Sequence, residues 1–378
     1  MAMLRWTRRC LAALPLLAEL VAATDASWPV VDISPRQDDF DFHVAATAAV
    51  EAMMSTYVNH TGLYGEPESP WYQSGVALQA MLDYMLATGS REYLPQAINT
   101  IERQRVPVPW WPEGGGEFRA DSTDDTGWWA LAMTSMYELT GDGEYLDIAR
   151  LGEEYIFGYW NTTTCGGGLI WDIRNLEYQN AISNELYLTL TARLHRLIPG
   201  DTKYLNQSLF EWEWFAASGM INSENLVNDG LTQDAACINN GQTTWTYNQG
   251  VLLGGLVDLF GATGDHSFIE RARAVADAVL SSDLLVQDGV LTEDCPPGPD
   301  CEVDAPIFKG IFIRYLAKLD RALPGERPYR EFIEANARSA YDSSRNGSDF
   351  YGYLWQGPFD MFSNARQVSA VNLMVAWL

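Results

Sequence analysis

A short phrase built on a glycine and an aromatic residue recurs along the chain at intervals of 52 to 64 residues. The clearest copy runs from Gly89 to Leu94. The others begin at Gly141, Gly200, Gly264 and, most loosely, Gly325. Glycine ends a helix well because it accepts a positive φ, and the Asp or Ser that follows can cap the next helix. Each phrase predicts the tight turn of a helical hairpin, and the repetition predicts stacked helix pairs.

The stretches on the two sides of these turns differ in charge. A single charged residue occurs in each of three stretches that precede a turn, 73–88, 126–140 and 244–263. Five or six occur in the stretches that follow, 90–105, 142–159 and 265–282. Helices that are apolar nearly all round are buried, whereas amphipathic helices face water. The first helix of each pair is therefore expected to be inner and the second outer.

Twelve helical stretches are expected in all. They lie near 41–58, 72–88, 90–105, 125–140, 142–159, 178–196, 201–218, 244–263, 265–282, 306–322, 328–344 and 363–378. Twelve helices in alternating inner and outer order predict an all-α fold, an (α/α)6 barrel of six helical hairpins, with an open superhelical array as the alternative. No run of strands is evident, although residues 167–173 are compatible with a short hairpin arm. The outer-to-inner connections are long, and long connections commonly carry function.

The N-terminal residues 1–23 have the pattern of a secretory signal peptide. Three arginines precede an apolar run over residues 10–23 that is too short to span a bilayer. Small residues place cleavage near 23–26. We expect residues 27–378 to form one domain that is secreted or held in a cell wall. No hydrophobic tail that would serve as a GPI-attachment signal is seen.

Cysteines and glycosylation sequons agree with export. Cys295 and Cys301 flank a Pro-Pro-Gly-Pro-Asp loop and are expected to pair, which leaves Cys165 and Cys237 for a second disulfide, although four cysteines allow three connectivities. Sequons for N-glycosylation occur at Asn59, Asn161, Asn206 and Asn346.

The formal net charge of −26 argues against nucleic acid and anionic membranes as partners. A neutral polysaccharide is compatible with it. No glycine-rich phosphate loop follows a strand, so no nucleotide is expected. The four histidines are scattered, and we expect neither a metal nor a cofactor.

Three acids lie together at the start of an otherwise almost uncharged inner stretch. They are Asp121, Asp124 and Asp125, followed at once by Thr-Gly-Trp128-Trp129. One interpretation is structural, because Ser122 with Asp125 resembles a capping box and acids are favoured in a first helical turn. The other is chemical, because paired carboxylates at the mouth of a barrel can divide into an acid and a nucleophile or base.

The run from Asp124 to Ala132, Asp-Asp-Thr-Gly-Trp-Trp-Ala-Leu-Ala, resembles the signature of glycoside hydrolase family 76. This family comprises endo-α-1,6-mannanases and fungal wall proteins of the Dfg5 and Dcw1 type. Supporting stretches begin at Cys165, Asn180, Thr244 and Phe308, and the resemblance covers most of residues 40–378. It implies an (α/α)6 fold and a retaining mechanism on α-1,6-linked mannan, with the fungal cell wall or membrane surface as the setting.

Carried onto this chain, the resemblance makes Asp124 the nucleophile and Asp125 the acid/base. Retention requires the two carboxyl groups to lie about 5–5.5 Å apart. Aromatic platforms for sugar are expected from Trp71, Tyr72, Trp128, Trp171 and Tyr247. Ligands for sugar hydroxyls are expected from Asp121, Asp172, Asn184, Asn248 and Gln249. Core packing or helix–helix bonding is the plainer explanation for each of these supporting residues.

Two other functions use the same sequence features. A transglycosidase of wall assembly would need the same aspartates, with a sugar acceptor in place of water. A catalytically silent glycan-binding or structural wall protein would not need them, so the intact Asp124 and Asp125 argue against it.

Overall fold

The computed structural model describes residues 40–65, 69–107, 115–176, 178–295, 301, 303–323 and 325–378. These residues form twelve α-helices. The odd-numbered helices are α1 (Phe42–Ser55), α3 (Leu94–Gln104), α5 (Gly143–Phe157), α7 (Lys203–Ala217), α9 (His266–Leu280) and α11 (Arg330–Ser339). The even-numbered helices are α2 (Trp71–Thr88), α4 (Thr123–Thr140), α6 (Ala181–Leu197), α8 (Thr246–Thr263), α10 (Ala305–Ala322) and α12 (Asn364–Val375). The expected signal peptide and the expected start of the domain lie outside the described residues.

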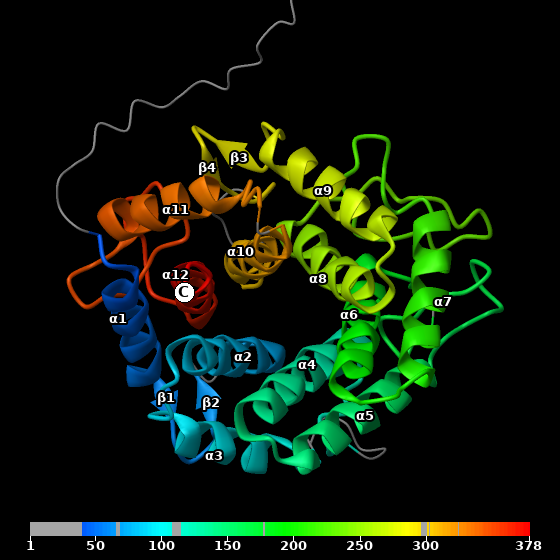
Figure 1. Ribbon diagram of the computed structural model, residues 1–378, viewed down its shortest axis with the longest axis horizontal. Coiled ribbons are helices and arrows are strands. Elements are labelled where there is room, and N and C mark those ends of the chain that lie inside the picture. Colours follow the sequence, from blue (N-terminus) through cyan, green and yellow to red (C-terminus); the bar gives the residue numbers. More distant parts are fainter. Residues whose placement is uncertain are drawn as a thin grey trace, which may run out of the picture. The chain divides into compact units, whose positions relative to one another are not determined.

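The even-numbered helices form a closed inner ring. Each packs against the next in chain order, and α12 packs against α2, so that no open end remains. The odd-numbered helices surround this ring (Figure 1). The (α/α)6 barrel is therefore confirmed, and the open superhelical array is wrong because the last inner helix contacts the first.

The tight turns between inner and outer helices follow the repeated phrase. Gly89, Gly141 and Gly264 each end an inner helix with φ between 70° and 75°. Asp142 then accepts a hydrogen bond of 3.0 Å from the amide of Glu144 and so caps α5. The loosest copy differs, because the positive φ in that turn falls on Arg327 rather than on its glycine.

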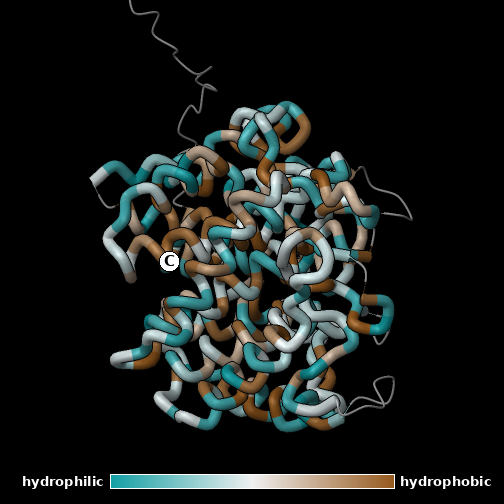
Figure 2. Tube along the Cα trace, turned by 90° about the vertical axis from the view of Figure 1, so that its right-hand side faces the viewer, coloured by the Kyte–Doolittle hydropathy of each residue, from teal (hydrophilic) through white to brown (hydrophobic). Residues whose placement is uncertain are grey.

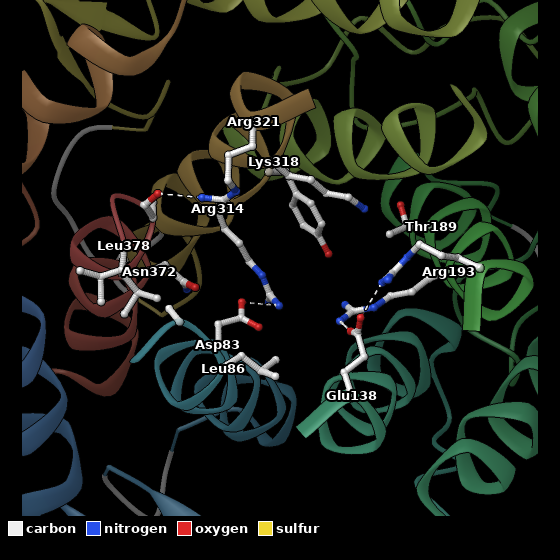
Figure 3. A pocket seen from close by; sticks show the side chains of 15 residues that line it. Asp83, Leu86, Glu138, Thr189, Arg193, Arg314, Lys318, Arg321, Asn372 and Leu378 are labelled. Carbon is white, nitrogen blue, oxygen red and sulfur yellow. Dashed lines mark hydrogen bonds and ion pairs between the residues drawn. The ribbon is translucent and has the colours of Figure 1, made fainter. Parts of the chain in front are cut away.

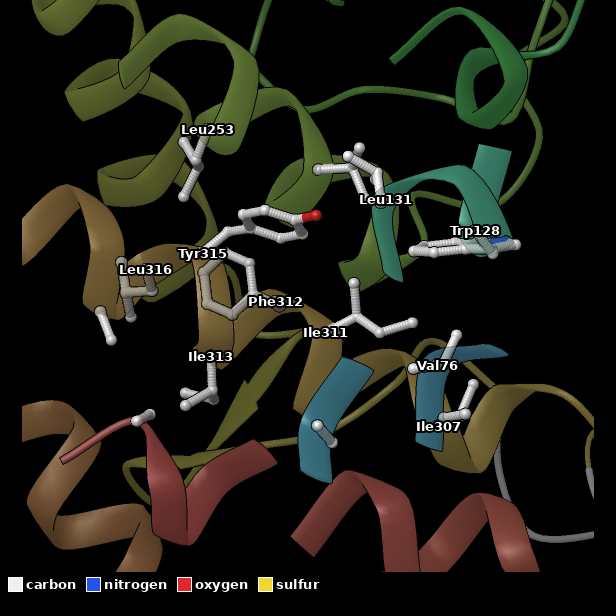
Figure 4. Close-up of a cluster of buried hydrophobic side chains, with 14 of the residues drawn as sticks. Val76, Trp128, Leu131, Leu253, Ile307, Ile311, Phe312, Ile313, Tyr315 and Leu316 are labelled. Carbon is white, nitrogen blue, oxygen red and sulfur yellow. The ribbon is translucent and has the colours of Figure 1, made fainter. Parts of the chain in front are cut away.

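The core lies between the inner helices and between the inner and outer rings. Figure 4 labels Val76 of α2, Leu131 of α4, Leu253 of α8 and Ile311 of α10, and all four side chains are almost fully buried. Figure 2 shows hydrophobic segments through the middle of the trace and hydrophilic stretches along its edge. Among the described residues, no helix is both long enough and apolar enough to cross a bilayer.

Strands are few and short within the described residues. They form two antiparallel hairpins, β1 (Tyr57–Val58) with β2 (Leu63–Tyr64) and β3 (Val286–Gln287) with β4 (Val290–Leu291). The hairpin arm considered for residues 167–173 is not formed by that segment alone. Its Leu169 pairs with Trp160 and its Asp172 pairs with Ser122 through single bridges. Three glycines with positive φ, at 166 to 168, turn the chain here and prevent a regular ladder.

Both expected disulfides are present. Cys165–Cys237 joins two of the long connections across 72 residues, and Cys295–Cys301 closes a short loop. Of the four sequon asparagines, Asn59 and Asn206 are exposed, and the other two, Asn161 and Asn346, are partly exposed. All four are therefore on the surface of the described part of the chain.

Candidate active site

A cavity of about 320 Å³ opens where the inner helices begin. Its lining residues lie in the first turns of α2, α4, α8 and α10, just before α6 and α10, and in the long connections. They are Tyr72, Ser122, Asp124, Asp125, Trp128, Trp171, Tyr178, Asn180, Asp229, Tyr247, Asp304 and Phe308. This is the end of the barrel that carries the long outer-to-inner connections, where the sequence predicts function.

The first turn of α4 presents the two adjacent aspartates to this cavity. The start of the helix is fixed by Thr123, whose amide donates to the Trp171 carbonyl at 2.9 Å and whose hydroxyl donates to the Ile170 carbonyl at 2.8 Å. Ser122 is the N-cap residue but makes no capping hydrogen bond with its side chain. The capping box expected from Ser122 is therefore not formed.

Opposing interactions act on the pKa of the Asp124 carboxyl group. Burial raises its pKa to about 6, against hydrogen bonds from the Asp125 amide, the Ser122 hydroxyl and the Trp171 indole. Among the described residues, Oδ1 of Asp124 has no hydrogen-bond partner. A buried carboxylate oxygen that faces a cavity without a partner is able to interact with a bound molecule.

Asp125 holds its proton more firmly. Burial raises the pKa of this carboxyl well above its usual range, and the charges of Asp124, Asp121 and Asp304 raise it further. The Ser122 hydroxyl opposes this shift only in part. Two neighbouring carboxyl groups are thus placed in environments that favour one ionised and one protonated form near neutral pH.

Flat aromatic side chains form much of the remaining wall. Trp128 is almost fully buried and stacks at a distance beside Tyr72 and Tyr247, with ring centroids 6.3 and 6.4 Å apart and interplanar angles of 29° and 19°. Tyr247 stacks in turn on Phe308 at 3.9 Å. Trp171 is 39% exposed and lies at the edge of the cavity. Such surfaces suit the apolar faces of a sugar ring.

Two further carboxylates line the cavity that sequence reasoning did not single out. Asp229 accepts a hydrogen bond from the Tyr178 hydroxyl, and Asp304 accepts one from the Tyr72 hydroxyl at 2.7 Å. Asp304 immediately precedes α10 and Asp229 lies in the connection before α8. Their place in long outer-to-inner connections was the available signal. Nothing in their local sequence distinguishes them from surface aspartates.

Three of the sequence candidates support the cavity wall from behind. Asn184 accepts a hydrogen bond of 2.8 Å from the Leu169 amide, and Gln249 accepts one of 2.8 Å from the Val227 amide. Asn248 is fully buried in α8, and its side-chain amide has no hydrogen-bond partner among the described residues. None of the three is among the described residues that line the cavity.

The other three candidates also lie outside the described lining. The Trp71 indole donates to Oε1 of Gln104 at 2.7 Å and packs on Trp129. Asp121 and Asp172 both pair with Arg174, at 2.9 and 3.0 Å. This shared ion pair ties the segment before α4 to the connection that carries Trp171. Of the residues proposed from sequence, the structure brings together Tyr72, Asp124, Asp125, Trp128, Trp171 and Tyr247.

A model of glycosyl hydrolase family 76 matches residues 42–378, which includes every residue of this cavity. The chain belongs to that family. It is therefore a glycoside hydrolase, as the resemblance of its motifs predicts. Within the described residues, no group of three or more His, Cys, Asp or Glu is placed to hold a metal ion.

Fungal relatives share most of this family 76 chain. Mannan endo-1,6-alpha-mannosidase DFG5 of Saccharomyces cerevisiae is 27% identical over 357 residues, which cover 87% of this chain and 76% of the relative. Mannan endo-1,6-alpha-mannosidase DCW1 of the same yeast is 26% identical over 343 residues, which cover 84% and 74%.

Solved structures of family 76 enzymes share the fold. The GH76A alpha-1,6-mannanase of Salegentibacter is 25% identical with a TM-score of 0.80, covering 89% of this chain and 99% of that one. The same enzyme has been solved with alpha-1,6-mannotriose as an inactive variant in which two consecutive aspartates are replaced by asparagine. Dfg5 of Chaetomium thermophilum, in complex with glucosamine, is 20% identical with a TM-score of 0.79 and covers 90% of this chain and 91% of its own.

Proposed function

We propose that this family 76 enzyme is a retaining glycosidase that hydrolyses internal α-1,6-mannosidic linkages of mannan. The observation that carries the proposal is the pair of adjacent buried carboxyl groups, Asp124 and Asp125, in one cavity, with burial and mutual repulsion setting their proton affinities apart. Its support from relatives is the pair of consecutive aspartates whose replacement inactivates the Salegentibacter mannanase.

In the first step Asp125 gives its proton to the glycosidic oxygen while Asp124, ionised, attacks the anomeric carbon. The C–O bond to the leaving sugar breaks, and an ester between Asp124 and the remaining sugar forms. In the second step the Asp125 carboxylate takes a proton from water, whose oxygen attacks the same carbon and releases Asp124. Two inversions give net retention.

The electrostatics of the pair assist this change of role. The charge of Asp124 is one cause of the raised pKa of Asp125, and that charge disappears when Asp124 becomes an ester. The pKa of Asp125 then falls, which favours its action as a base in the second step. A single pair of neighbouring residues can thus serve both steps.

The remaining lining suits a mannose residue. Trp128, with Tyr72 and Tyr247 beside it, offers apolar surface to the sugar ring. Asp229 and Asp304 offer carboxylate oxygens that accept hydrogen bonds from sugar hydroxyls. Trp171 at the edge would stack on a neighbouring residue of the polymer, which favours an internal over a terminal linkage.

The proposal includes export through the secretory pathway, with removal of the signal peptide near residues 23–26 and glycosylation of the four sequons. Two disulfides support an oxidising compartment. Surface positions of the asparagines, with Asn59 and Asn206 exposed, support their modification.

Product analysis on unbranched α-1,6-mannan oligosaccharides tests the activity. We expect shorter products that first appear as the α-anomer by NMR, with Asp124→Asn and Asp125→Asn each slower by about a thousandfold. Asp147→Asn, which removes an exposed carboxylate of α5, is the matched control and should retain full activity.

Two other outcomes have a definite meaning. Products longer than the substrate would identify a transglycosidase, in which a sugar acceptor replaces water in the second step. A folded protein that turns over neither mannan oligosaccharides nor other α-mannoside and GPI-glycan donors would be a glycan-binding protein, and the proposed activity would be wrong.

A further inference from the structure

A second cavity, of about 410 Å³, lies at the opposite end of the inner ring. Its lining comes mainly from the C-terminal halves of α2, α4, α6, α10 and α12, whereas the catalytic cavity lies at the N-terminal ends of the inner helices. Five basic side chains line it: Arg193, Arg196, Arg314, Lys318 and Arg321. Figure 3 shows Arg193 of α6 and Arg314 and Lys318 of α10 reaching into the space between the helices. This concentration of cations stands out in a chain whose net charge is −26.

The acidic side chains of the cluster do not balance its basic ones. Glu138 pairs with Arg193 and Arg196, and Asp83 pairs with Arg314 at 2.6 Å. Lys318 pairs with Asp258 at 2.5 Å, although Asp258 itself does not line the cavity. Arg321 donates to the Ala376 carbonyl at 3.1 Å and has no carboxylate partner among the described residues. Five basic side chains therefore meet three acidic ones and, at the last residue of the sequence, the carboxylate of Leu378, which also lines the cavity.

Part of this positive charge has a structural explanation. Five inner helices contribute their C-terminal halves to this cavity, and cations near helix C-termini interact favourably with the partial negative charge of the last carbonyls. Lys318 donates to the Gly254 carbonyl at 3.1 Å in addition to its ion pair, and Arg321 binds the carbonyl of Ala376. These two contacts stabilise the end of the barrel.

Two donors in the cavity lining are left over after these contacts. Nε of Arg193 and the hydroxyl of Tyr315 are buried and have no hydrogen-bond partner among the described residues. Figure 4 shows the Tyr315 ring reaching from α10 into the space that the inner helices enclose. Buried donors normally have acceptors, so unpartnered donors beside surplus positive charge point to an anionic acceptor.

We propose that this cavity binds a phosphate group, either as free phosphate or as a phosphate ester of a sugar. A tetrahedral oxyanion accepts several hydrogen bonds at once from guanidinium and hydroxyl donors, and arginine suits it through its planar fork. A neutral sugar would leave the surplus charge unpaired. A nucleotide would need an aromatic surface for its base, and the described lining has one aromatic side chain, Tyr315.

Access to this site does not pass through the catalytic cavity. Leu86, Ala87 and Arg196 are exposed at its rim, so the cavity opens to solvent at the end of the barrel that carries the short turns. Binding there does not depend on the proposed mannanase activity, and either can fail without the other.

Isothermal titration of the full-length protein tests the site, with inorganic phosphate in one arm and mannose 6-phosphate in the other, at constant ionic strength set with NaCl. We expect saturable one-to-one binding. Arg196→Gln should weaken it about tenfold, because it removes a charged donor at the rim. Tyr315→Phe should weaken it several-fold without loss of thermal stability, because the lost hydroxyl has no partner in the protein.

Arg271→Gln, which removes an exposed arginine from α9, is the matched control and should bind like the wild type. Tighter binding of mannose 6-phosphate would identify the ester as the ligand, and equal or tighter binding of inorganic phosphate would identify the free ion. No saturable binding of either probe to the folded wild type would overturn the proposal. So would equal affinities in Arg196→Gln, Tyr315→Phe and Arg271→Gln.

Discussion

The Tyr72 hydroxyl donates a hydrogen bond of 2.7 Å to Oδ1 of Asp304, which joins the first turn of α2 to the residue before α10. Nε2 of Gln73 strengthens this junction by donating to the Val303 carbonyl at 2.8 Å. The carboxylate of Asp304 is thereby held in the cavity wall. Its negative charge is one of three that raise the pKa of Asp125.

Asp304→Asn should therefore change the pH dependence of catalysis. Removing the charge lowers the pKa of Asp125, which must be protonated in its proposed role as the acid. The active protonated form is lost as pH rises through that pKa, so the basic limb of the kcat/KM profile should move to lower pH. Tyr72→Phe is the control. It keeps the carboxyl groups of Asp304 and Asp125, so the basic limb should stay in place. A basic limb that stays fixed in Asp304→Asn would remove Asp125 from the role of acid.

Replacing Trp171 should move the opposite limb. Burial raises the pKa of Asp124 to about 6, and the Trp171 indole is one of the hydrogen-bond donors that restrain this rise. Trp171→Phe keeps an aromatic face and removes the N–H, so the pKa of Asp124 should rise. Because Asp124 in its proposed role as nucleophile is active only when ionised, the acidic limb of the kcat/KM profile should then move to higher pH.

Trp171→Ala separates stacking from this electrostatic effect. It should shift the acidic limb in the same direction and also lower kcat/KM by about tenfold at the optimum, through lost contact with the sugar. Equal kcat/KM values for Trp171→Phe and Trp171→Ala at their optima would mean that the ring does not contact substrate.

The Cys165–Cys237 disulfide should contribute more to stability than the other disulfide. It closes a segment of 72 residues, against 6 for Cys295–Cys301, and the loop-entropy model assigns about 4 kcal/mol to the longer loop and about 2 kcal/mol to the shorter one. Paired serine substitutions at each disulfide, compared by urea denaturation, measure this difference. A larger loss for the short loop would contradict the expected order.

The fold could be predicted from sequence because its signal is repeated. Glycine at a helix end and a charge-poor stretch before it recur, and each copy supports the others. Gly325 shows the limit of this reasoning, because the turn around it places the positive φ on Arg327 instead. The two short hairpins, β1–β2 and β3–β4, were missed because two-residue strands have no periodicity to detect.

The residues of the site were harder to predict, because the side chains of consecutive residues in a helical motif point in different directions. Tyr247 faces the cavity, and successive residues of a helix are rotated by about 100°, so Asn248 and Gln249 turn away into the wall of the barrel. Asp229 and Asp304 reach the cavity from connections whose course depends on tertiary contacts such as Tyr178 to Asp229. Such residues are recognised only once the ring is closed.

The close approach of neighbouring inner helices gives a stability prediction with an internal control. A Cβ atom at Gly250 of α8 would lie 2.5 Å from Cα of Phe312, in the backbone of α10, which cannot move aside locally. Gly250→Ala should therefore force the two helices apart and lower the free energy of unfolding by about 2–3 kcal/mol.

Gly261→Ala in the same helix should do the reverse. Gly261 is exposed, its Cβ would meet no atom within 4 Å, and alanine favours the helix over glycine by about 0.5–1 kcal/mol. Urea midpoints for the two variants and the wild type measure both effects. If both alanines raised the midpoint, helix propensity and not the contact between α8 and α10 would govern Gly250, and the tight packing of the inner ring would not require glycine there.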